Sequence, residues 1–86
     1  MKKKEKIDLS VALSYTIGEE APVIVASGKG LVAKRIKEIA IENGIKIVED
    51  EALANILVES EIGDCIPEET YLAIAAIFAF LQSSDL

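Results

Sequence analysis

Apolar and polar positions alternate near the start of the chain. From Ile7 to Tyr15 every second residue is large and apolar, and the residues between them are small or polar. A period of two is typical of a β-strand with one buried face. A continuous apolar stretch at Val23–Ala26 predicts a second strand, buried on both faces, after a connection that contains Gly18 and Pro22.

The period changes to that of a helix after the second strand. Apolar residues recur at helical spacing at Val32, Ile36, Ile39 and Ala40. An amphipathic helix is therefore expected over residues 31–43, with Gly44 at its end. The run Ile45–Val48 predicts a third strand, and strand, helix and strand in this order predict a right-handed βαβ unit with parallel strands.

Two further helices are predicted in the second half of the chain. Asp50 is suited to cap the first of them, and Gly63 marks the loop that follows. Pro67 suits the first position of the last helix. Glu68 and Glu69 then lie where the helix dipole favours negative charge, which explains them better than a catalytic carboxylate pair does.

The last helix, which extends to about residue 83, is apolar on almost every side. Such a helix has to be covered on more than one side. Two explanations are open, namely burial against the sheet and contact with a partner.

These elements predict an α/β fold in one domain. We expect a small central mixed sheet of about three to four strands, including the βαβ unit, surrounded by about three to four helices. Residues 1–6 are expected to form a flexible basic N-terminus, residues 7–83 the domain, and residues 84–86 a short tail. The 86-residue chain is 51% hydrophobic and only 5% aromatic, so its core should be aliphatic.

Charge and composition narrow the function. The net charge of −6 argues against nucleic acid as a partner. The chain has no histidine, which excludes a Cys–His nucleophile and a histidine-containing metal site, and we expect no enzyme. The single cysteine, Cys65, fits a reducing compartment and is expected to be at least half-buried. The apolar runs are too short to span a bilayer, so a soluble, cytoplasmic protein is expected.

A glycine pattern lies between the second strand and the first helix. Gly28, Gly30 and Ala33 form G-x-G-x-x-A, the pattern of a dinucleotide-binding turn. The chain is too short for the βαβαβ unit that completes such a site. The simpler interpretation is a tight strand-to-helix turn, with Gly28, Gly30, Gly44 and Gly63 as structural turn residues. A small nucleotide-binding regulatory domain is the alternative function.

An ordered series of motifs carries a family resemblance from Leu9 to about Leu81. The series is V-A-L-x-Y, A-P, G-x-G-L-x-A-x-x-I, E-x-x-x-L-A, E-I-G-x-x-I-P and a terminal apolar helix. It resembles the C-terminal cytoplasmic domain of the FlhB/YscU family, the substrate-specificity switch proteins of flagellar and type III secretion export gates.

The resemblance implies a central sheet wrapped by helices, with neither cofactor nor nucleotide. It implies a role in flagellar biosynthesis and type III protein secretion, with export-apparatus components and export substrates as partners. Association with the membrane would then occur through the export gate. An interaction protein that is no longer tied to export is a further alternative.

The sequence departs from the family at its autocleavage motif, Asn-Pro-Thr-His. Glu5, Lys6, Ile7 and Asp8 stand at these four positions. A glutamate lacks the side-chain amide that attacks the backbone carbonyl, and Lys6 lacks the restricted geometry of proline. Asp8 replaces the histidine that could move a proton. We expect a stand-alone, non-cleaving homologue with no catalytic residue.

Four apolar residues are the candidates for partner binding. Ala21 and Pro22 match the A-P of the family, and Ala75 and Phe78 share a face of the last helix because they lie three residues apart. The resemblance implies that such a patch binds short segments of export substrates. The alternative is that all four residues are simply packed in the core.

Overall fold

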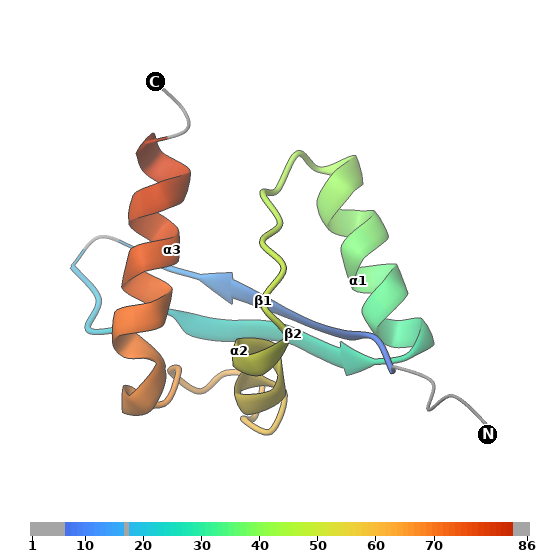
Figure 1. Ribbon diagram of the computed structural model, residues 1–86, viewed down its shortest axis with the longest axis horizontal. Helices are drawn as coiled ribbons and strands as arrows, with labels where there is room; N and C mark the ends of the chain where they lie inside the picture. Colours follow the sequence, from blue (N-terminus) through green and yellow to red (C-terminus); the bar gives the residue numbers. More distant parts are fainter. Residues whose placement is uncertain (1–6, 17, 84–86) are drawn as a thin grey trace.

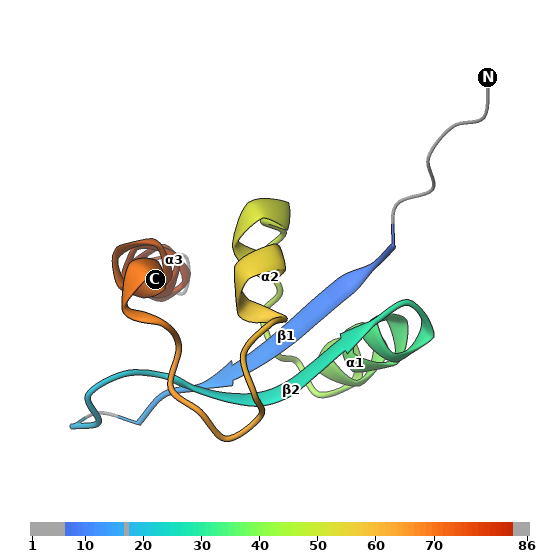
Figure 2. The same ribbon diagram turned by 90° about the horizontal axis from the view of Figure 1, so that it is seen from below.

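The computed structural model describes residues 7–16 and 18–83, and it shows a two-stranded sheet with helices on both sides (Figures 1 and 2). The mixed α/β class is thus confirmed. The predicted N-terminal segment at residues 1–6 and the tail at residues 84–86 lie outside the described residues. In chain order the elements are β1 (Leu9–Ser14), β2 (Val23–Lys29), α1 (Leu31–Glu42), α2 (Glu51–Leu57), the short 3₁₀ helix η1 (Glu68–Thr70) and α3 (Tyr71–Ser83).

The two strands are antiparallel. Leu9 lies opposite Lys29 at one end, and Ser14 lies opposite Val23 at the other. The register shifts between Ala12 and Leu13, which leaves an extra residue on β2. A bulge of this kind bends the strand and increases its twist.

The predicted third strand and the βαβ unit are wrong. Within the described residues the sheet has two strands, and residues 45–50 belong to neither. This segment runs across the strands, from the end of α1 to the start of α2 (Figures 1 and 2). Because those helices lie on opposite sides of the sheet, the connection has to pass from one side to the other. It therefore does not lie alongside a strand, as a hydrogen-bonded ladder requires.

Helix α1 packs against the face of the sheet that carries small residues. Ser10 Oγ donates a hydrogen bond of 2.9 Å to the carbonyl oxygen of Ala33, and Ala33 is fully buried. The prediction that the apolar face of α1 points into the core is correct only in part, because Val32 and Ile39 on this face are 57% and 41% exposed. A two-stranded sheet is too narrow to cover the whole apolar stripe of the helix.

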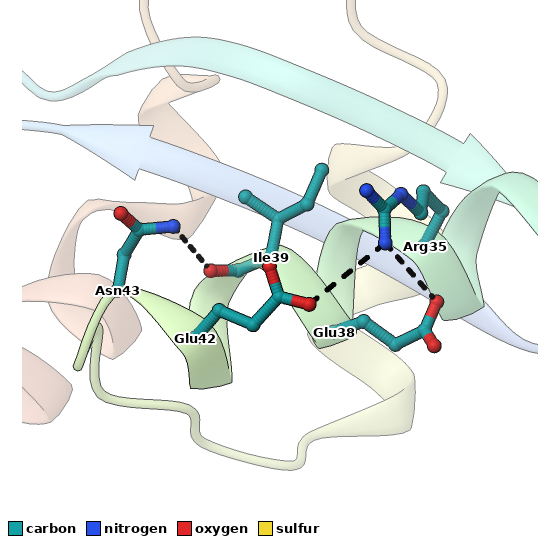
Figure 3. A network of polar contacts seen from close by, with 5 residues as sticks. All are labelled: Arg35, Glu38, Ile39, Glu42 and Asn43. Atoms are coloured by element: carbon teal, nitrogen blue, oxygen red, sulfur yellow. Dashed lines mark hydrogen bonds and ion pairs between the residues drawn. The ribbon is translucent and has the colours of Figure 1, made fainter.

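The end of α1 is held by local polar contacts (Figure 3). Asn43 Nδ2 donates a hydrogen bond of 2.8 Å to the carbonyl oxygen of Ile39. Arg35 forms ion pairs with Glu38 and Glu42 at 3.7 and 4.0 Å. These exposed pairs lie on α1 itself and contribute little to the packing of the domain.

The main core lies on the opposite face of the sheet, beneath α2 and α3 (Figure 2). The apolar side of β1, predicted from its alternation, contributes Val11 and Leu13 to it. Asp50 caps α2 as predicted, since its side chain accepts a hydrogen bond of 3.0 Å from the Leu53 amide. The buried cluster consists of Ala21, Ile24, Leu53, Leu57, Ile66 and Ile74.

Residues 63–66 follow the edge of β2 and thereby place the start of α3. The Ile24 amide donates to the Asp64 carbonyl at 2.9 Å, and the Ile66 amide donates to the Pro22 carbonyl at 3.0 Å. Cys65 forms an isolated bridge with Val23 and is exposed, so the prediction that it is at least half-buried is wrong. In extended chain neighbouring side chains point to opposite sides, and at this point Ile66 is the one that enters the core.

Candidate functional site

A cleft of about 370 Å³ opens between α3 and the connection that leads into β2. The inner wall is formed by residues 20–22 and by Ile66, and the outer wall by one face of α3. Tyr15, just past the end of β1, closes one side. The connection and α3 lie together at the same end of the molecule in Figures 1 and 2.

All four residues that were predicted to bind a partner line this cleft. Ala21 and Pro22 are buried at its base, Phe78 is half-buried, and Ala75 is exposed. The structure therefore brings together two pairs of residues that lie more than fifty positions apart in the sequence. Ala21 and Pro22 are thus packed, as the core alternative expects, whereas the α3 side is open to solvent, so that partner binding there stays a prediction.

The hollow follows from the order of residue sizes along α3. Tyr71, Ala75, Phe78 and Gln82 lie at spacings of four, three and four, which places them on one face of the helix. The small Ala75 separates the two aromatic side chains, so a depression is left between them. Within Tyr71–Ser83 there is no charged residue, so this wall offers apolar contact without ionised groups.

An aromatic pair joins the two sides of the site. The rings of Tyr15 and Phe78 have centroids 6.0 Å apart and planes inclined by 46°. Tilted pairs at such distances are favourable. A shallower hollow of about 250 Å³ lies beside this pair and is also lined by Leu81 and Gln82.

The polar groups of the cleft lie at its margin. Partial burial raises the pKa of the Tyr71 hydroxyl above its ordinary value, and the negative charges of Glu20 and Glu68 and the side chain of Cys65 raise it further. Tyr71 therefore keeps its proton at neutral pH and can donate a hydrogen bond. Apolar walls with a few polar groups at the edge are typical of sites that bind ligands.

The glycine pattern of the strand-to-helix turn has a structural explanation. Gly30 has a positive φ of 62°, and its amide donates a hydrogen bond of 2.8 Å to the Asp8 carbonyl. A Cβ atom at Gly28 would collide with Val32, so β2 and α1 approach closely only with glycine here. The side chain of Lys29, which lies between the two glycines of the pattern, forms an ion pair with Glu59 at 3.8 Å. A two-stranded antiparallel sheet has no parallel switch point, where a Rossmann-type crevice forms.

Gly44 and Gly63, the other predicted turn residues, also have positive φ angles of 68° and 98°.

The positions of the cleavage motif are described only in part. Glu5 and Lys6 lie outside the described residues. Ile7 is exposed, and the carboxylate of Asp8 lies 3.9 Å from Lys34 Nζ. Through its carbonyl and its carboxylate, Asp8 thus fixes the start of β1 to the turn before α1 and to α1 itself.

Among residues 7–16 and 18–83, no group of three or more histidine, cysteine, aspartate or glutamate side chains is arranged to hold a metal ion. No helix in this part is long and apolar enough to cross a membrane.

Sequence reasoning missed seven residues that line the cleft, namely Tyr15, Glu20, Ile66, Tyr71, Ile74, Ala79 and Gln82. Tyr71 and Gln82 could have been found, because they share the helical spacing of Ala75 and Phe78. Tyr15 and Glu20 gave no such signal, since their place at the cleft depends on how the connection folds back towards α3.

Comparison with known proteins identifies relatives over nearly the whole domain. The model of the FlhB HrpN YscU SpaS family matches residues 7–81. FlhB of Escherichia coli (strain K12) is 45% identical over 74 residues, which are 84% of this chain but 19% of that protein. The chain thus spans about a fifth of the FlhB proteins that it matches. YlqH of Bacillus subtilis (strain 168) is 37% identical over 86 residues, and the match covers 99% of this chain and 92% of YlqH.

Solved structures share the fold. The C-terminal domain of PscU superposes with a TM-score of 0.81 at 24% identity, over 86% of this chain and 96% of that one. The cytoplasmic domain of FlhB from Shewanella putrefaciens has a TM-score of 0.79 at 32% identity, over 84% of this chain and 57% of that one.

Proposed function

Because the chain belongs to the FlhB HrpN YscU SpaS family, we propose that it acts in flagellar or type III protein export as a domain that binds segments of export substrates. The binding site is the cleft beside α3. Its place of action is the cytoplasm, where it meets components of the export apparatus. The match to YlqH covers 92% of that protein, so the domain makes up nearly the whole of one relative.

One observation carries the proposal. Ala21, Pro22, Ala75 and Phe78, the candidates for partner binding from the sequence, all line one open cleft. Ala75 is small and Phe78 is large, so the α3 wall offers both a hollow and an apolar surface beside it. A short apolar segment in extended form fits such a surface better than a polar one, because it removes apolar area from water.

The domain acts in this proposal without cleaving itself. The sequence has Glu5 and Lys6 in place of the asparagine and proline of the family motif. Asp8, at the histidine position, is engaged with Lys34 and with the turn at Gly30. This arrangement supports a role for Asp8 in holding β1 rather than in proton transfer.

The experiment is a map of the binding site by NMR. An apolar export-substrate peptide is added to ¹⁵N-labelled protein, and amide shifts are followed. We expect shifts at Ala21, Ala75 and Phe78, and none at Gly28 and Gly30. Shifts confined to Gly28–Gly30, or no shift at millimolar peptide, would contradict the proposal. The same spectra recorded with ATP or NADH test the nucleotide alternative.

A further inference from the structure

The margin of the cleft is acidic although its walls are apolar. Glu20 lies in the lining, and Glu68 lies near enough to Tyr71 to affect its hydroxyl group. Both side chains are exposed. A ligand that fills the apolar hollow therefore lies close to the carboxylate of Glu20.

These carboxylates have no ion-pair partner among the described residues. Residues 7–16 and 18–83 include five basic residues, and each of them interacts with a group other than Glu20 and Glu68. Lys46 Nζ donates a hydrogen bond of 3.3 Å to the carbonyl oxygen of Leu81. The other four form ion pairs, namely Lys29 with Glu59, Lys34 with Asp8, Arg35 with Glu38 and Glu42, and Lys37 with Glu49.

The negative field at the cleft is therefore not neutralised locally. The net charge of the chain, −6, adds to it over longer distances. Burial is the main cause of the raised pKa of Tyr71, and Glu20 and Glu68 are smaller causes, in line with negative charge beside this wall of the cleft. A positive charge placed at this margin would be attracted, and a negative one repelled.

We propose that the segment bound in this cleft carries a lysine or arginine next to the apolar side chain that fills the hollow. The inference rests on the proposed function, since it specifies the chemistry of the substrate segment. A cleft of about 370 Å³ is near the lower end of the range of ligand sites, roughly 300–1,000 Å³. It suits one large apolar side chain and its neighbours, so the flanking residue necessarily lies at the margin, where Glu20 is.

The test uses three labelled peptides that share one apolar core and differ in one flanking residue, which is lysine, glutamine or glutamate. Fluorescence anisotropy gives the dissociation constant of each. We expect the lysine peptide to bind about two- to fivefold more tightly than the glutamine peptide, as for an exposed ion pair. The glutamate peptide should bind more weakly than both. The preference should shrink as salt is raised.

Two variants locate the effect. Glu20→Gln removes one carboxylate at the margin and should reduce the preference for lysine. Glu42→Gln removes the same charge from α1, where Glu42 pairs with Arg35, and should leave the preference intact. An equal loss in both variants would show that only net charge matters and would overturn the proposal.

The outcomes separate this inference from the proposed function. If all three peptides bind equally, and Phe78→Asp abolishes the binding of each, the cleft binds apolar segments but the inference is wrong. If no peptide binds, both fail. Self-association of the protein that Glu20→Gln abolishes, measured by sedimentation, would identify a second copy as the occupant and would also overturn the inference.

Discussion

The rings of Tyr15 and Phe78 meet at a centroid distance of 6.0 Å, across the end of β1 and the middle of α3. Helix α3 lies on the sheet side that carries the core cluster, and Ile77 and Phe78 pack against that cluster. The aromatic pair therefore helps to hold the open end of the cleft in shape. It links the stability of the domain to the geometry of the proposed site.

A double-mutant cycle should detect this link. We expect Tyr15→Ala and Phe78→Ala each to lower the free energy of unfolding, with a coupling of about 0.5–1.5 kcal/mol between them. Urea unfolding provides the four values. Phe80→Ala, at a residue that is 67% exposed, is the matched control and should not couple with Tyr15→Ala. A coupling near zero between Tyr15 and Phe78 would argue against the ring contact.

The turn before α1 should not tolerate a side chain at Gly28. A Cβ atom there would lie against Val32 and 3.3 Å from the Ala33 amide nitrogen. We expect Gly28→Ala to destabilise the protein by about 1–3 kcal/mol, as for an overpacked site. Adding Val32→Ala should recover much of the loss in thermal unfolding. Unchanged stability of Gly28→Ala would mean that β2 and α1 do not approach so closely.

Local features were the ones that the sequence could predict. The two faces of β1, the cap at Asp50 and the turn at Gly30 depend on residues within a few positions of each other. The run at Ile45–Val48 has the same local signal as a strand, but pairing depends on where α1 and α2 lie, and they place it across the sheet. Cys65 was misjudged for a similar reason, since its exposure follows from the burial of Ile66.

Only part of the candidate site could be predicted from the sequence. The spacing of Ala75 and Phe78 shows that they share a helix face, whereas nothing in the sequence shows that they meet Ala21 and Pro22. No sequence period links the connection at residues 15–22 to α3. The carboxylate of Glu20 could not be assigned to the site before the fold was known.

The ionisation of Tyr71 gives a test of the electrostatics that needs no ligand. In a Tyr15→Phe variant Tyr71 is the single tyrosine, so its absorbance at alkaline pH reports it alone. We expect a midpoint above the ordinary value of 10.0. Glu20→Gln should lower this midpoint, but burial, the larger cause, should keep it raised. A midpoint at or below 10.0 would contradict the described surroundings of Tyr71.

The same shift predicts how stability depends on pH. Because the pKa of Tyr71 is higher in the folded than in the unfolded chain, both states hold the proton well below pH 10. As the pH rises above 10, the unfolded chain releases its proton first. The contribution of this group is thus fully present below pH 10 and is lost as the pH rises through the folded pKa.

The protein should stay intact under conditions that favour cleavage within Asn-Pro. Glu5 has no side-chain amide, and Lys6 is not proline. We expect a single species by mass spectrometry after prolonged incubation at mildly alkaline pH. Replacing residues 5–8 by Asn-Pro-Thr-His gives the matched positive control. A fragment of the unaltered protein that begins at Lys6 would show that cleavage does not need the asparagine.

The affinity of the domain for an apolar export-substrate peptide tests the central claim most directly. The dissociation constant is measured for the unaltered protein, for Phe78→Asp, and for Leu72→Asp, which alters a residue of α3 that is 88% exposed and lies outside the cleft lining. Circular dichroism confirms that each variant is folded. We expect Phe78→Asp to weaken binding about tenfold or more, which corresponds to about 1.4 kcal/mol or more, and Leu72→Asp to change it little. Equal affinity of all three proteins would contradict the assignment of the cleft as the binding site.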